Sequence, residues 1–328
     1  MEEIMVSVIC TTYNQKNYIS RCLESLVSQK TSFRYEIIVH DDASNDGTAN
    51  IVREYANKYP ELIVPILQKE NQYSKQKGSV RKFIDPLVRG KYRAHCEGDD
   101  FWCDEEKLQK QYKVMEANQN CSMCVHSTKR VNDVEIEVGE SFPNIDFKEG
   151  VVSTQHMIDS FPEWSFHLSS FFIREAYYKK IYTLDRELFD SFPVGDIRIL
   201  YCMAVFGDYY YIEKAMSCYT VNAQNSWTRR QNKKSLNEFN NKMILMSNLY
   251  MKYLQKERPE VDVTNIKTNV IPYYEFQILI YDKKYKQLLG RKYKKFFEDL
   301  NCKFKAKIYL LSFFPALDRI IGRKKQYE

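Results

Sequence analysis

The sequence predicts an α/β protein with a mostly parallel sheet and flanking helices, followed by a mainly helical C-terminal region. Short apolar runs typical of buried strands alternate with helical patterns through the first half of the 328-residue chain, which favours parallel strands covered on both faces. From about residue 230 onwards the patterns are helical, beginning with "SLNEFNNKMILMSNLYMKYLQKE". We therefore expect two domains, residues 1–228 and residues 229–328.

The first strands and the helices between them follow in order from the residues. The run "VSVICTT" is typical of a buried strand, and the segment after it places Ile19, Leu23 and Leu26 on one helical face. Thr48 is expected to cap the helix that follows the turn-rich "DDASNDGT". These patterns predict strands at 6–12, 35–40, 62–67 and 91–96, and helices at 17–29, 49–59 and 104–118.

The region from residue 122 to 220 is predicted to be mixed. It begins beside a CxxC pair, Cys121 and Cys124. Since a structural zinc site needs four ligands and no second pair accompanies this one, we favour a strand there. We expect strands at 122–127, 131–138, 169–173 and 209–220, and helices near 175–182 and 196–206.

The composition is that of a soluble globular protein, with 44% hydrophobic and 28% charged residues. The nine cysteines have no disulfide-framework spacing, which indicates reduced thiols and a cytoplasmic location. The sequence opens on a strand pattern and has no apolar run near the ~20 residues that cross a bilayer. We therefore expect neither a signal peptide nor a transmembrane helix.

Polar clusters follow three of the predicted strands: "TTYN" at 11–14, "DDASNDG" at 41–47 and "EGDD" at 97–100. A fourth acid, Asp196, opens a later helix. Each cluster alone is most simply a turn or a helix cap. Because ligands of open parallel sheets bind beyond the carboxyl ends of the strands, the clusters together predict one crevice lined with carboxylates.

Such a crevice suits a divalent cation, Mn²⁺ or Mg²⁺, together with the phosphates of a ligand. Gly98 would permit the sharp turn that brings the acids to one side. Neither GxxxxGK[ST] nor GxGxxG occurs in the chain, so a glycine loop does not cradle the phosphates. We expect the basic segment that contains Lys75, Lys77 and Arg81 to help neutralise the phosphates, and we assign Arg81 to nucleotide binding.

Three segments, "VSVICTTYNQKNYISRCLESLVSQ", "YEIIVHDDASNDGT" and "GKYRAHCEGDDFW", resemble in order and spacing the family 2 glycosyltransferases. The resemblance covers about residues 5–220. It implies the Rossmann-like GT-A fold, and "EGDDFW" is similar to the motif of bacterial capsular and surface-polysaccharide transferases.

The resemblance also implies roles for the matching residues. Thr11 and Tyr13 correspond to residues that hold the nucleotide base, and Asp42 to the acid that binds the base imide, with Asp41 a weaker candidate. Asp99 corresponds to an acid near the ribose and the metal, and Asp100 to the metal ligand. The family often has an aspartate where this chain has Glu97, so a direct metal contact of Glu97 stays open.

The segment "GDIRIL" matches the position of the family's catalytic base, which assigns that role to Asp196. An inverting transfer needs a carboxylate that takes the proton of the acceptor hydroxyl; the alternative for Asp196 is a helix N-cap. Trp102, Trp164 and His167 are candidates for the acceptor face, although a tryptophan is as often part of the core. Asn222 stands where the family often has a histidine, which leaves the third protein ligand of the metal open.

These observations predict a metal-dependent inverting glycosyltransferase of the hexosyl or N-acetylhexosaminyl type. We expect it to transfer a sugar from a nucleoside diphosphate, UDP in the first instance, to a hydroxyl of a lipid-linked glycan in bacterial surface-polysaccharide synthesis. The enzyme alternative is a nucleotidyltransferase, for which "TTYNQKN" lacks the glycine- and arginine-bearing loop. The non-enzyme alternative is a catalytically silent nucleotide-sugar-binding subunit of an assembly complex.

The basic charge is concentrated at the C-terminal end, where residues 283–328 hold 14 Lys/Arg and 4 Asp/Glu. Within residues 294–325 these charges alternate with large apolar residues. This pattern fits either an exposed helix or a helix that lies on an anionic membrane. We expect peripheral contact with the inner face of the cell membrane, and no nucleic acid partner, since the rest of the chain is net acidic.

Overall fold

The computed structural model describes residues 3–75, 80–144, 147–161, 166–221, 223, 233–315 and 317. The chain divides into two compact units. Unit 1 comprises Met1–Phe189 and Val194–Arg230, and unit 2 comprises Asp190–Pro193 and Gln231–Glu328.

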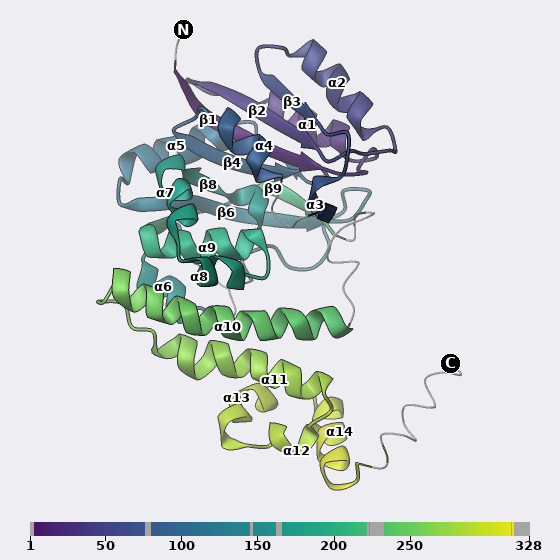
Figure 1. The fold of residues 1–328 in the computed structure, drawn as a ribbon, viewed down its shortest axis with the longest axis vertical. Coiled ribbons are helices and arrows are strands. Elements are labelled where there is room, and N and C mark those ends of the chain that lie inside the picture. Colours follow the sequence, from purple (N-terminus) through teal and green to yellow (C-terminus); the bar gives the residue numbers. More distant parts are fainter. Residues whose placement is uncertain are drawn as a thin grey trace. The chain divides into compact units, whose positions relative to one another are not determined.

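The described part of unit 1 is built on a nine-stranded sheet with the order β3-β2-β1-β4-β8-β6-β9-β5, in which β7 pairs with β9 (Figure 1). The four strands from β3 to β4 are parallel, as are β6 and β9, while β5, β7 and β8 pair antiparallel. The strands are β1 (Ile4–Thr12), β2 (Arg34–Asp41), β3 (Ile63–Leu67), β4 (Tyr92–Glu97), β5 (Phe101–Trp102), β6 (Cys121–Val131), β7 (Gly150–Val152), β8 (Phe172–Arg174) and β9 (Asp208–Thr220).

Helices and short 3-10 segments connect these strands. The helices are α1 (Ile19–Val27), α2 (Thr48–Lys58), α3 (Gln72–Lys75), α4 (Arg81–Ile84), α5 (Lys107–Ala117), α6 (Thr154–Asp159), α7 (Glu175–Lys180), α8 (Arg186–Ser191) and α9 (Gly195–Phe206). The 3-10 segments are η1 (Asp85–Leu87), η2 (Leu168–Ser170) and η3 (Ile181–Thr183).

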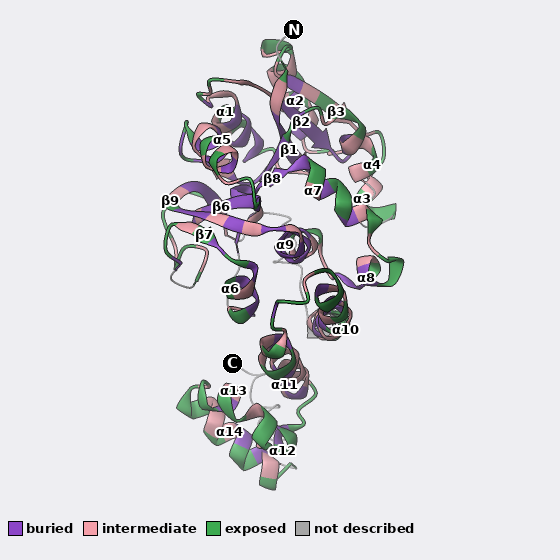
Figure 2. Cartoon of the chain, turned by 90° about the vertical axis from the view of Figure 1, so that its left-hand side faces the viewer, coloured by how far each residue is buried: buried purple, intermediate pink, exposed green. Residues whose placement is uncertain are grey.

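Alternation along β1 explains how the sheet is covered on both faces. Val6, Val8 and Cys10 belong to the main apolar cluster with residues of α1, α2 and α5. Ile9 points the other way and packs with Ile84 of α4, as the two-residue period of a strand requires. Figure 2 shows the central strands buried and the outer faces of the helices exposed. The predicted mostly parallel α/β sheet is therefore confirmed.

Unit 2 is helical in its described part. It contains α10 (Lys233–Glu257), the π-helical η5 (Ile266–Val270), α11 (Ile271–Tyr281), α12 (Tyr285–Leu288), η6 (Arg291–Tyr293), α13 (Lys294–Glu298) and α14 (Cys302–Phe313). Its core includes Phe276, Leu279, Leu288, Ile308 and Leu311. In the described part of the chain, none of the helices has both the length and the apolar content that a membrane span needs.

Three local expectations were wrong. The strand expected at 169–173 is the 3-10 segment η2 followed by β8, which begins only at Phe172. Residues 131–138 do not form a strand beyond Val131, because the Asn132 side chain accepts hydrogen bonds from the Val134 and Ile136 amides and closes a turn. Thr48 is not the cap of α2 but its first residue, and Asp46 accepts its backbone N–H. The CxxC pair lies within β6 with both thiols free, as expected.

Gly98 is required where the chain leaves β4, because the end of β1 comes very close to it. Its N–H donates to the Thr11 carbonyl at 2.9 Å. A Cβ at this position would lie 2.6 Å from both the Thr12 hydroxyl and Gln15 Oε1. The missing side chain therefore lets the two strand ends, and the polar residues that follow them, pack together.

We predict that Gly98→Ala lowers the free energy of unfolding by about 1–3 kcal/mol, because the Thr12 and Gln15 side chains must move to admit the methyl group. Denaturant unfolding measures this loss. Gly195→Ala is the matched control, since Gly195 is helical and its Cβ would meet no atom closer than 4.0 Å. Equal stability of the Gly98 variant and the wild-type protein would contradict the close approach.

Candidate metal and nucleotide site

The end of β4 and the turn after it hold three acids, two of which are buried. Asp100 is 1% exposed and Asp99 is 9% exposed, while Glu97 is partly buried. The Asp100 amide donates to the Glu97 carbonyl at 2.9 Å and closes the turn. Asp100 Oδ1 accepts the backbone N–H of Thr220, at the end of β9, at 3.0 Å. The acidic turn is thus fixed between the ends of two strands that are far apart in the sequence.

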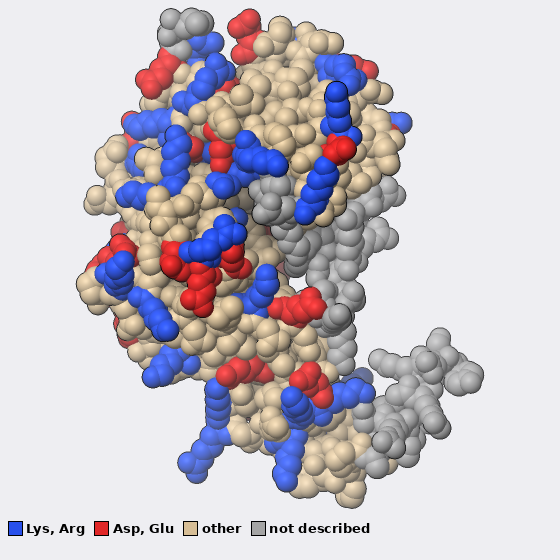
Figure 3. Space-filling view, viewed as in Figure 1, with Lys and Arg blue, Asp and Glu red and all other residues tan. Residues whose placement is uncertain are grey.

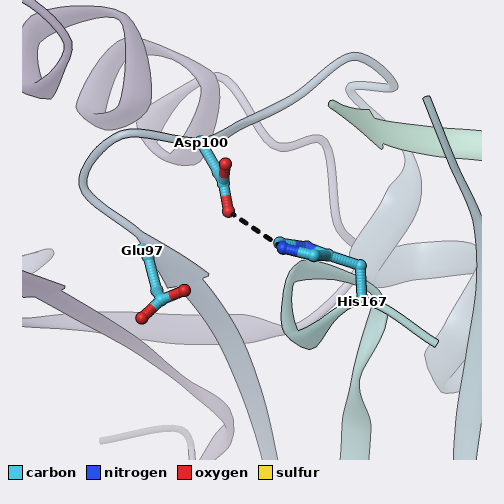
Figure 4. A group of neighbouring side chains, drawn as sticks. All are labelled: Glu97, Asp100 and His167. Carbon is cyan, nitrogen blue, oxygen red and sulfur yellow. Dashed lines mark ion pairs between the residues drawn. The ribbon is translucent and has the colours of Figure 1, made fainter. Parts of the chain in front are cut away.

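His167 joins this turn from the residue before η2. Its Nε2 lies 3.7 Å from Asp100 Oδ2, and one potential ligand atom from each of Glu97, Asp100 and His167 lies within 4.8 Å of the other two. Figure 4 shows the imidazole directed towards Asp100. The expectation placed His167 at the acceptor face, but the structure places it with the acids.

The His167 ring is held by a series of buried hydroxyl groups. Its Nδ1 lies 2.8 Å from Ser169 Oγ, which donates to Ser217 Oγ at 2.8 Å, and Ser217 contacts the Thr128 hydroxyl at 2.9 Å. The ring of Tyr219 packs beside it. Nδ1 also accepts the backbone N–H of Ser169 at 3.3 Å. Binding a metal through Nε2 requires the other tautomer, in which Nδ1–H is donated to the Ser169 hydroxyl.

The electrostatics of the turn favour a bound cation. Burial, with the charges of Asp99 and Asp196, raises the pKa of Glu97 to about 8. Burial and the two neighbouring acids raise the pKa of Asp100 well above its usual value, and burial raises that of Asp99. Burial also lowers the pKa of His167 to about 3, so the ring is neutral at pH 7. Buried carboxylates with a neutral imidazole are ligands that fit a divalent cation.

Asp196 faces this group from the first turn of α9. Val194 is the N-cap residue of α9, and Asp196, inside the first turn, accepts the neighbouring Ile197 N–H at 2.8 Å. Its carboxylate is exposed, but surrounding protein atoms reduce its hydration and raise its pKa. Its charge raises the pKa values of Glu97 and Tyr73. Asp196 is therefore close to the acidic turn.

The expected nucleotide residues lie on or beside loops that are joined by hydrogen bonds. Thr11 is the last residue but one of β1 and Tyr13 follows the strand, and both are partly buried. In the same loop, the Asn14 amide donates to Ser44 Oγ at 2.8 Å. Asp42 is 5% exposed and accepts the amides of Gln72 and Tyr73 at 2.8 and 3.0 Å. It therefore caps α3, a function that the sequence did not predict.

Two other expected site residues, Arg81 and Trp102, lie in a different environment. Arg81 bonds Asp85 at 3.1 Å and stacks on Tyr182, so its charge is already partnered within unit 1. Trp102 is 4% exposed, and the Lys107 ammonium lies 4.0 Å from its ring centroid. This burial contradicts the expectation that Trp102 offers a face to an acceptor. Trp164, Lys77 and Asn222 lie outside the described residues.

Supporting residues that the sequence analysis missed surround the acids. Gln15 hydrogen-bonds Asp99, and the charge of Arg21 lowers the pKa values of Asp99 and Asp100, opposing the effect of burial. Arg21 also donates to the Thr220 hydroxyl at 3.0 Å. Of these residues only Gln15 could have been found from the sequence, because it directly follows "TTYN". Arg21 lies in an ordinary helix and Thr220 at the end of a strand.

We predict that Asp100→Asn stabilises the metal-free protein. A carboxyl whose folded-state pKa is raised destabilises the fold above its unfolded pKa, and asparagine keeps the oxygen that accepts the Thr220 amide. Removing this cost should raise the melting temperature at pH 7 by roughly 2–4 °C in the presence of a chelator. Glu61→Gln, the same acid-to-amide change at an exposed side chain, is the control and should leave the melting temperature unchanged. A lower melting temperature for Asp100→Asn would contradict the repulsion described above.

Solved structures share this fold. A complex of Staphylococcus aureus TarS 1–349 with UDP-GlcNAc has a TM-score of 0.55 at 18% identity, covering 88% of this chain and 82% of that one. The Pyrobaculum calidifontis mannosyltransferase PcManGT, in complex with GDP-Man and Mn²⁺, has a TM-score of 0.54 at 13% identity and covers 95% and 88%. These identities establish the fold alone and confirm the GT-A-like arrangement.

Curated relatives match a shorter part of the chain. An uncharacterized Mycobacterium tuberculosis protein is 40% identical over 126 residues, which are 38% of this chain and 35% of the relative. The Escherichia coli UDP-Glc:alpha-D-GlcNAc-diphosphoundecaprenol beta-1,3-glucosyltransferase WfgD is 29% identical over 136 residues, or 42% and 50%. The family model for glycosyl transferase family 2 matches residues 7–179, more than half of the sequence, and the chain therefore belongs to glycosyl transferase family 2.

Proposed function

We propose that the protein is a metal-dependent, inverting glycosyltransferase that moves a sugar from a nucleoside diphosphate to a hydroxyl group of a glycan. The observation that carries this proposal is the convergence of Glu97, Asp100 and His167 within 4.8 Å, with Asp196 close to them. Paired with the family membership of residues 7–179, this arrangement supplies both a cation site and a separate carboxylate for acid–base chemistry.

Asp100, Glu97 and His167 would hold Mn²⁺ or Mg²⁺, with Asp99 beside them. A bound cation would neutralise the negative charge that develops on the leaving diphosphate. Manganese is supported as one choice by the Mn²⁺ in the complex of the mannosyltransferase PcManGT. His167 takes the place of the third protein ligand that the sequence left open.

Thr11, Tyr13, Asp42 and Asp99 are the proposed nucleotide residues. Thr11 and Tyr13 lie where β1 ends, beside the acidic turn, and Asp99 is held there by Gln15. Asp42 keeps a second lone pair on each oxygen after accepting two amides, which allows it to bind a base imide as well. UDP is the proposed nucleotide, in line with the UDP-GlcNAc bound in the TarS complex.

Asp196 is the proposed catalytic base. Its carboxylate accepts the proton of the acceptor hydroxyl while that oxygen bonds to the anomeric carbon and the bond to the nucleoside diphosphate breaks on the opposite face. A pKa raised towards neutrality improves a carboxylate as a proton acceptor, and the limited hydration of Asp196 acts in this direction.

A lipid-linked glycan is the proposed acceptor, and the inner face of the bacterial cell membrane the proposed location. The name of WfgD describes a glucosyl transfer to a diphosphoundecaprenol-linked sugar. Transfer of a hexose or N-acetylhexosamine during surface-polysaccharide synthesis is the corresponding proposal for this chain.

The test is release of free nucleotide from UDP-, dTDP- and GDP-sugars in the presence of Mn²⁺. We expect release from a UDP-sugar, and we expect Asp196→Asn to reduce it by at least 10²-fold while UDP binding, measured by calorimetry, stays within about twofold. Asp190→Asn is the control substitution. UDP binding without release from any donor would instead identify a silent binding subunit, and full turnover of Asp196→Asn would exclude Asp196 as the base.

A further inference from the structure

We infer that α12 and α14 of unit 2 form a surface that binds the anionic headgroups of a phospholipid bilayer. The surface, called here the α12/α14 face, consists of Lys283, Lys284, Lys286, Lys303, Tyr309, Leu310, Phe313 and Phe314. It deepens the proposed function, because it explains how an enzyme without a membrane span among its described helices would meet a lipid-linked acceptor.

The first observation is an apolar strip on α14 that is exposed in the described part of the chain. Phe313 is 73% exposed and Phe314 is 60% exposed, and Tyr309 and Leu310 are about half exposed. The opposite side of the same helix buries Ile308 and Leu311 in the core of unit 2. A helix that is apolar on both sides is normally buried on both. The exposed strip therefore indicates a second apolar environment.

The second observation is positive charge directly beside this strip. Residues 282–315 contain ten Lys/Arg and three Asp/Glu. Lys283, Lys284 and Lys286 line a hollow of about 270 Å³ together with Leu311 and Pro315. Lys286 also lines a second hollow, of about 480 Å³, together with Phe313. Figure 3 shows lysine and arginine side chains on this unit, with some acidic side chains between them and uncharged surface beside them.

This combination selects the partner. Basic residues next to exposed aromatic and aliphatic side chains are typical of segments that lie in the headgroup layer of an anionic membrane. A second copy of the chain would bring two strongly positive faces together, which repel. A neutral sugar would leave the lysine charges unpaired. A free phosphate would make no contact with the exposed phenylalanine rings. An anionic phospholipid surface uses both.

The experiment measures sedimentation of the full chain with vesicles, without donor or metal. We expect binding to vesicles of phosphatidylcholine mixed with phosphatidylglycerol, weaker binding to phosphatidylcholine alone, and weakening by salt. Phe313→Ser/Phe314→Ser should reduce partitioning by roughly tenfold or more. Lys286→Glu/Lys303→Glu should reduce it by at least the roughly fivefold per lysine expected near an anionic surface.

Matched controls come from α10, where Leu245 and Lys252 are also exposed; Leu245→Ser and Lys252→Glu should bind like the wild-type protein. Failure of the wild-type chain to bind the phosphatidylglycerol vesicles would overturn the inference, as would full binding by both double variants. Conversion of a dimer to a monomer by the phenylalanine double variant would assign the face to a second copy. Displacement by inorganic phosphate, but not by chloride at equal ionic strength, would assign the hollows to free phosphate.

Nucleotide release in solution separates this inference from the proposed function. The lysine double variant should release nucleotide from a UDP-sugar at the wild-type rate, because its substitutions lie in unit 2. Lost vesicle binding with intact release supports the α12/α14 face. Intact vesicle binding with no release by the wild-type chain would instead remove the proposed function.

Discussion

The candidate site depends on the repulsion among three carboxylates at the end of β4 and in the turn after it, two of which, Asp99 and Asp100, are buried. Glu97, Asp99 and Asp100 stand within four residues, and burial together with their neighbours' charges raises the pKa values of Glu97 and Asp100. Left alone, such a group destabilises the fold. A bound divalent cation would neutralise the carboxylates and remove this repulsion, which favours cation binding. The neutral His167 would add a ligand without adding charge.

The surroundings of the turn are organised to keep this unfavourable group in place. The absent side chain of Gly98 lets β1 and β4 approach, Thr220 binds Asp100, and Arg21 partly offsets the negative charge. A series of buried hydroxyls from Ser169 to Thr128 holds the imidazole. The buried acids therefore destabilise the fold at the carboxyl ends of the strands, where substrates of open α/β sheets bind. The main apolar cluster of the sheet and its helices offsets this cost.

Much of the fold followed from local patterns. The first four strands and their helices could be predicted because each alternates or repeats with the period of its own structure, and the acids at the strand ends were recognisable from spacing. His167 could not be assigned to the acids, because its approach depends on how η2 packs seventy residues further along the chain. The burial of Trp102 and the capping of α3 by Asp42 likewise depend on tertiary contacts that no local pattern records.

The central claim is that Glu97, Asp100 and His167 together hold one divalent cation. Pulsed electron paramagnetic resonance of the protein with one equivalent of Mn²⁺ tests it most directly, because an imidazole nitrogen bound to the ion produces a nitrogen modulation. The account predicts this modulation in the wild-type protein and its loss in His167→Ala, with His156→Ala as the unaffected control. Mn²⁺ that binds with oxygen ligands only, or does not bind at all, would contradict it.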